Sequence, residues 1–141
     1  MKLFLALSLL MSTAYGTTCG KKTIDFEEFN AGDIPAASEG VAISGTGGFG
    51  PLIFDTANPT GEDEDLGVPG AGMVLIVSED GDQSDPDDNL DGGFLTFDFA
   101  EPVLVKSIKF IDTEQKPTVI LTFKDGKTER VLGKKTGDKE A

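Results

Sequence analysis

Hydrophobic and polar residues alternate with a period of two in several short runs along the chain. Beyond the first sixteen residues, no run has the 3.6-residue period of an amphipathic helix. The clearest alternation is at 93–100, GFLTFDFA, where apolar residues are separated by Thr96 and Asp98. This pattern predicts a strand with one buried and one solvated face. Residues 72–79, GMVLIVSE, are almost continuously apolar, which predicts a central strand buried on both faces.

Shorter runs predict six further strands, at 23–29, 40–45, 50–55, 103–112, 118–126 and 127–133. The last two would form a hairpin through Asp125-Gly126, a favoured two-residue turn. Many short strands, separated by turns that use the chain's 18 Gly and 7 Pro, predict an all-β fold. We expect an antiparallel, jelly-roll-like β-sandwich that is incomplete at its C-terminus, with 134–141 as a polar tail or fragment end.

The first sixteen residues have the organisation of a secretory signal. Lys2 supplies a positive start, an apolar stretch follows at 3–11, and small residues precede the predicted cleavage after Gly16. The apolar stretch is short for a membrane span. The alternative is a buried first helix or strand. A lipid-anchored Cys19 is a weaker alternative, because Thr18 stands where lipoprotein signals have a small residue. We therefore predict a secreted, extracellular protein whose acidic domain covers residues 17–133.

Composition narrows the chemistry further. Cys19 is the only cysteine, so it is either free or pairs with another chain, as an intermolecular disulfide. The chain has no histidine, which excludes histidine-based triads and the usual zinc and copper sites. Most of the phenylalanines fall at inward-pointing strand positions, where we expect them to fill the core.

Charge is distributed unevenly along the sequence. The formal net charge is −13, and between Thr23 and Val105 there are nineteen acidic residues and no Lys or Arg. From Lys106 onward there are nine basic and six acidic residues. Such an acidic body repels nucleic acid and attracts cations. We expect no nucleic-acid partner and no membrane span.

Two acidic loops flank the apolar stretch at 72–79 and hold most of this charge. From them we select ten candidate metal ligands: Asp55, Asp63, Asp65, Glu79, Asp80, Asp82, Asp85, Asp87, Asp88 and Asp91. Calcium is the expected ion, because it accepts six to eight oxygen ligands in irregular geometry. Residues 80–91 resemble an EF-hand loop, but Asp85 replaces the required glycine and no helix flanks the loop. The alternative is a pair of solvated acidic turns.

The stretches LIFDTANPTGEDEDLGVPG and VLIVSEDGDQSDPDDNLDGGFLTFDFAEPVLVKSIKFID resemble a secreted β-sandwich domain. That domain is common in bacterial proteins with a PEP-type C-terminal sorting signal. The resemblance covers about Ile24 to Gly126, and it implies a sandwich fold and an extracellular setting. The chain is also similar, in charge and secretion alone, to acidic organic matrix proteins of shells and skeletons.

These observations give a functional hypothesis and an alternative. The first is a non-enzymatic, calcium-binding structural protein of an extracellular matrix, which could be mineralised and whose partners would be calcium ions and a mineral surface or matrix polymer. The alternative is a calcium-dependent adhesion or carbohydrate-binding module, which should show exposed aromatic or amide side chains beside its calcium loops. An enzyme is disfavoured, because the carboxylates lie in turn-rich loops without a recognisable cleft motif.

Overall fold

The computed structural model describes residues 6–10, 21–113 and 115–137. Strands dominate them, with one short 3₁₀ turn, η1 (Glu64–Leu66). The strands are β1 (Ala6–Leu10), β2 (Lys21–Ile24), β3 (Ala37–Ser38), β4 (Val41–Thr46), β5 (Pro51–Asp55), β6 (Met73–Val77), β7 (Phe94–Asp98), β8 (Leu104–Lys109), β9 (Thr118–Thr122) and β10 (Thr128–Leu132). Every pairing between them is antiparallel. The predicted all-β, antiparallel fold is confirmed.

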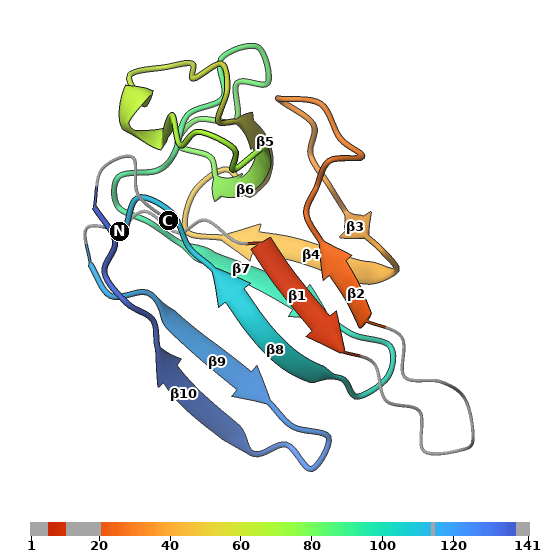
Figure 1. Cartoon of the computed structure of the whole chain (residues 1–141). Coiled ribbons are helices and arrows are strands. Elements are labelled where there is room, and N and C mark those ends of the chain that lie inside the picture. Colours follow the sequence, from red (N-terminus) through yellow and green to blue (C-terminus); the bar gives the residue numbers. More distant parts are fainter. Residues whose placement is uncertain (1–5, 11–20, 114, 138–141) are drawn as a thin grey trace.

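Two three-stranded sheets, in the orders β2-β1-β8 and β3-β4-β7, form the layers of a sandwich (Figure 1). Between them lies one cluster of buried side chains, called here the sandwich core. Its fully buried members are Ile24, Phe26, Val41, Ile43, Ile53 and Leu75, and half-buried residues of β7 and β8 pack against it. In β7 the half-buried residues alternate with exposed ones, as the period-two pattern predicts.

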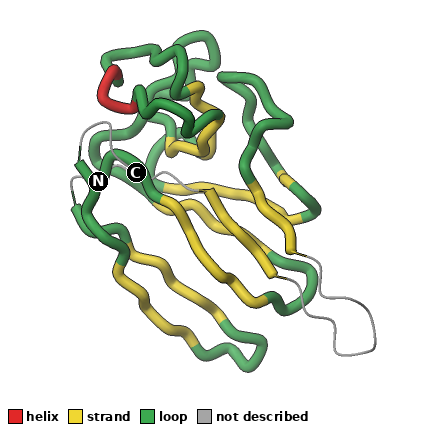
Figure 2. Tube along the Cα trace, in the orientation of Figure 1, coloured by secondary structure: helices red, strands yellow, loops and turns green. Residues whose placement is uncertain are grey.

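The β5–β6 hairpin is buried on both faces, but it is not part of a wider sheet. Ile53 and Leu75 point into the sandwich core, whereas their neighbours point to the opposite face. There they form a second cluster, called here the loop core, made of Leu52, Phe54, Leu66, Val68, Val74, Ile76 and Ile111. The prediction of burial on both faces was therefore right and that of a central strand wrong. Loop residues, rather than neighbouring strands, cover the second face, and Figure 2 shows how much loop surrounds this hairpin.

Strand β1 lies inside the predicted signal sequence. It pairs with β2 on one side and β8 on the other, so that Leu7 is opposite both Ile24 and Ile108. This is the arrangement that the alternative interpretation of the segment, a first strand, requires. The predicted cleavage site, Thr17 and Cys19 lie outside the described residues.

Two predicted element ends are wrong for local reasons. The strand expected at 23–29 ends at Ile24, because Phe26 has a φ of 64° and the Phe29 amide donates to the Phe26 carbonyl at 3.0 Å, which closes a turn. The β9–β10 connection is a three-residue loop rather than a two-residue turn. Phe123 N–H donates to the Lys127 carbonyl at 2.8 Å, and Gly126 takes the left-handed conformation that such loops need.

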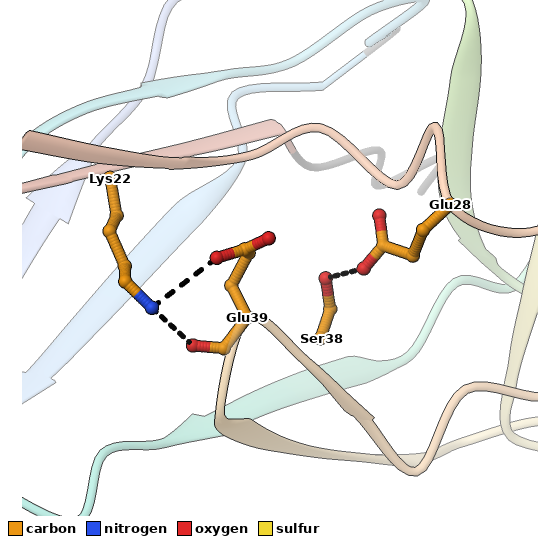
Figure 3. A network of polar contacts seen from close by, with 4 residues as sticks. All are labelled: Lys22, Glu28, Ser38 and Glu39. Carbon is orange, nitrogen blue, oxygen red and sulfur yellow. Dashed lines mark hydrogen bonds and ion pairs between the residues drawn. The ribbon is translucent and has the colours of Figure 1, made fainter.

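Side chains also connect the two sheets at one edge (Figure 3). Lys22 of β2 lies 3.3 Å from the Glu39 carboxylate, and its ammonium donates to the Glu39 carbonyl at the same distance. Next to it, the hydroxyl of buried Ser38 donates to the Glu28 carboxylate. These contacts hold β2 of one layer against the β3–β4 turn of the other.

The segment after β10 is not wholly a solvated tail. The Thr113 amide donates to the Thr136 hydroxyl at 2.9 Å, and the Thr136 amide donates to the Thr113 hydroxyl at 2.9 Å. Thr113 itself is fully buried. Residues 134–136 are therefore fixed to the end of the β8 segment. Across the described ranges, no helix is long and apolar enough to cross a membrane.

Candidate functional site: two interlocked acidic loops

The two acidic loops start from opposite ends of the β5–β6 hairpin. The first loop, 56–72, connects Asp55 to Met73, which face each other at one end. The second loop, 78–93, leaves β6 at the opposite end, after Val77. The first loop nevertheless reaches the second, because it folds back along the hairpin and buries Leu66 and Val68 in the loop core. Burial of this apolar surface stabilises the folded-back path.

Three hydrogen bonds join the loops where they meet. The Thr60 hydroxyl donates to the Pro86 carbonyl at 2.7 Å, and the Gly61 amide donates to the Asp85 carboxylate at 2.7 Å. The Asp88 amide donates to the Asp63 carboxylate at 2.6 Å. Each loop thus contributes a carboxylate that accepts a hydrogen bond from the backbone of the other loop. The sequence left open whether the loops share one end of the sandwich, and these contacts show that they do.

Within the second loop, some carboxylates accept hydrogen bonds from the loop's own backbone amides. Asp80 accepts from the Asp82 amide at 2.7 Å. Asp82 in turn accepts from the Ser84 amide at 2.8 Å and the Ser84 hydroxyl at 2.7 Å. These are turns in which an aspartate bonds the backbone two residues ahead. The bonds from Ser84 hold the pKa of Asp82 below its ordinary value of 3.8.

Asp87 experiences the opposite effect. Partial burial raises its pKa to about 6, and the charges of Asp80, Glu79, Asp63 and Asp85 contribute to the increase. Its Oδ1 is buried, and no described residue donates a hydrogen bond to it. Near neutral pH, Asp87 is therefore an anion in a place that disfavours a negative charge. A cation at this position would relieve that repulsion.

The ten predicted ligands divide into three groups. Eight gather where the loops meet or in their adjoining turns: Asp63, Asp65, Glu79, Asp80, Asp82, Asp85, Asp87 and Asp88. Asp91 is exposed farther along the second loop, where its amide donates to Asn89 at 3.1 Å. Asp55 is at the far end of the hairpin, where it accepts from the Asn58 side chain at 2.7 Å. The structure thus separates Asp55 from the other candidate ligands.

The described residues do not form a closed metal cage. Over these parts of the chain, no three Asp, Glu or Cys side chains are arranged as a group that could hold a metal ion. Asp63 and Asp88 are buried, with 8% and 5% of their surfaces exposed, whereas Glu79, Asp80, Asp82 and Asp85 are exposed. The chemistry available is therefore that of crowded carboxylates on a fixed backbone.

Sequence reasoning missed two residues of interest. Asp112 is completely buried and has a φ of 47°, and it directly follows Ile111 of the loop core. An acidic residue at the end of an apolar strand was the available signal. Phe49 was not singled out; 71% of its surface is exposed, and it lies against Gly81 of the second loop. Its position between glycines, in GGFGP, was the available signal.

Comparisons with known proteins add no relative. No protein-family model matches the chain, and neither the curated proteins nor the solved structures give a match. The fold and the acidic loops are therefore the basis on which a function is proposed.

Proposed function

We propose that the protein is a calcium-binding structural protein of an extracellular matrix, and that the junction of its two acidic loops is the binding region. The observation that carries the proposal is the crowding of charge at Asp87, whose pKa is raised to about 6 by burial and neighbouring carboxylates. The absence of a closed cage among the described residues favours weak binding, with water completing the coordination.

Calcium suits this junction better than magnesium does. Magnesium demands a near-ideal octahedron and gives up its water reluctantly, so it gains little from many carboxylates in irregular positions. Calcium accepts variable distances and a higher coordination number, including backbone and water oxygens. Binding should stabilise the folded state, because the unfolded chain lacks the junction.

The test is calorimetric titration with calcium and then magnesium, together with thermal unfolding of each complex. The test variant combines Glu79→Gln, Asp80→Asn and Asp87→Asn, which removes three charges but keeps oxygen acceptors. A matched variant combines Asp98→Asn, Glu101→Gln and Glu129→Gln, three exposed acids outside both loops. We expect the first variant to lose most of the calcium-dependent rise in Tm and the second to keep it. Equal losses in both variants would identify a diffuse anionic surface instead.

Secretion is part of the proposal and has its own test. Intact mass spectrometry of the exported protein should show loss of the first sixteen residues. A retained N-terminus would instead keep Ala6–Leu10 in the folded protein as β1, and it would remove the extracellular setting from the proposal.

A second candidate is the calcium-dependent adhesion or carbohydrate-binding module. The exposure of Phe49 beside the second loop favours it, because such modules need an apolar surface near the ion. Binding to polysaccharides, measured with calcium and with a chelator, separates the two candidates. Calcium-dependent retention that Phe49→Ser abolishes would support the second candidate.

A further inference from the structure

The acidic end carries exposed aromatic side chains as well as charge. Phe49 and Phe94 expose 71% and 64% of their surfaces. Their backbones lie near each other, because Phe94 pairs with Thr46, the last residue of β4, and Phe49 follows Thr46 by three residues. Exposed carboxylates of the second loop, including Glu79 and Asp80, border this area. Large exposed apolar side chains with a polar rim are typical of protein contact sites.

A complementary feature lies between β8 and the β9–β10 hairpin. A groove of about 500 Å³ runs there, with apolar lining from residues such as Ile108, Val119 and Leu121. Three exposed lysines, Lys106, Lys109 and Lys134, also line it. The groove thus combines apolar walls with positive charge in a protein whose net charge is −13.

One chain cannot bring these two features together. Leu95 and Phe97 of β7 pack into the sandwich core, toward the layer that contains β8. Because side chains alternate along a strand, Phe94 points the other way, out of the molecule. Among the described residues, the Phe94 side chain therefore points away from the groove of its own chain.

We propose that the occupant is a second copy of the protein, whose Phe49 and Phe94 surface docks in this groove while its carboxylates meet the three lysines. The match of charge commits the proposal to this partner, because an apolar surface ringed by acids fits an apolar groove ringed by bases. The contact joins two different surfaces, so it is heterologous. Repetition of such a contact yields an open chain of copies unless the rotation closes a ring.

The experiment uses sedimentation velocity of the full chain over a range of concentrations. The wild type should form a concentration-dependent series of oligomers. One variant, called the donor variant, combines Phe49→Ser with Phe94→Ser and removes the aromatic surface that docks. Another combines Lys106→Glu with Lys109→Glu and reverses the charge of the groove. Each variant alone should be monomeric. An equimolar mixture of the two should form a 1:1 dimer and nothing larger, because only one intact contact can form.

Matched controls are Phe123→Ser and Lys124→Glu, which change exposed residues that do not line the groove. Both should associate like the wild type, and circular dichroism should show that every variant is folded. A wild type that is monomeric at all concentrations would overturn the proposal. A donor variant that still dimerises by itself would overturn it as well, since that result indicates a symmetric interface elsewhere.

Discussion

At the residue scale, Asp82 and Asp87 show how one short loop gives two identical side chains opposite properties. Asp82 accepts two hydrogen bonds from Ser84, which favour its ionised form. Asp87 is partly buried among other carboxylates, which favours its protonated form. The chemistry of each carboxylate in this acidic run therefore depends on its own hydrogen bonds and burial as well as on the charges around it.

This difference predicts opposite pH effects for two substitutions. The pKa of Asp87 is raised from 3.8 to about 6, so its folded form holds a proton more tightly than its unfolded form. Its contribution to stability is greatest below pH 4 and is lost as pH rises to about 6. Asp87→Asn should therefore raise the Tm of the calcium-free protein at pH 7 and flatten its decline between pH 4 and 6. Differential scanning calorimetry with a chelator measures both.

Asp82→Asn is the control from the same loop. The pKa of Asp82 is lowered, so its contribution is present above the unfolded value and is lost as pH falls. This substitution should lower the Tm slightly at pH 7 and have less effect at pH 3. If both substitutions shifted Tm in the same direction at pH 7, crowding at Asp87 would not explain the loop's behaviour.

At the scale of elements, the acidic junction depends on a glycine in the first loop. Gly61 has a φ of 62°, and an added Cβ would lie 2.8 Å from the Cβ of Asp87. Gly70, in the same loop, has a φ of 76° with nothing within 4 Å of an added Cβ. Gly61 therefore combines a conformational requirement with close contact between the loops.

We expect Gly70→Ala to lower the free energy of unfolding by about 1 kcal/mol, which is the conformational penalty of the left-handed region alone. Gly61→Ala should cost more, because the second loop must also move, and it should weaken calcium binding as well as stability. Urea unfolding and calcium titration of both variants make the comparison. Equal costs with unchanged calcium binding would mean that the two loops are not coupled at Gly61.

The β9–β10 hairpin is more exposed to solvent than the β5–β6 hairpin. Every residue of β10 is exposed, whereas β5 and β6 have both faces covered. Hydrogen exchange in the monomer should therefore be fastest in β10 and slowest in β6 among the paired strands. Comparable protection in the two hairpins would contradict this ranking.

Much of the fold, but less of the site, could be predicted from the sequence. Alternation at 93–100 identified β7 because a half-buried strand imposes a local period. The return of the first loop was missed, because it depends on tertiary contacts. The bond from Thr60 to Pro86 joins residues 26 positions apart, and no local pattern encodes it. The same limit applies to Asp55, which lies near the other acids in sequence but at the far end of the hairpin.

At the scale of the whole molecule, charge separates the acidic body from the more basic region that begins at Lys106. With a net charge of −13, self-repulsion should destabilise the folded state at low ionic strength. Raising sodium chloride from 10 to 150 mM shortens the screening length from about 30 to about 8 Å, so Tm should rise. Calcium chloride at the same ionic strength should raise it further. Identical effects of sodium, magnesium and calcium salts on Tm would show that the loops act only as an anionic surface that salt screens.

The return of the first loop across the β5–β6 hairpin also has an evolutionary consequence. The same segment supplies acidic side chains to the junction and the apolar cover of the loop core, through Leu66 and Val68. Selection on these two tasks acts on different positions. Exposed Glu62 and Glu64 are free to drift among descendants of this gene, whereas Leu66, Val68 and Gly61 should change rarely. Ligand preference could thus diversify in this lineage without the architecture being rebuilt.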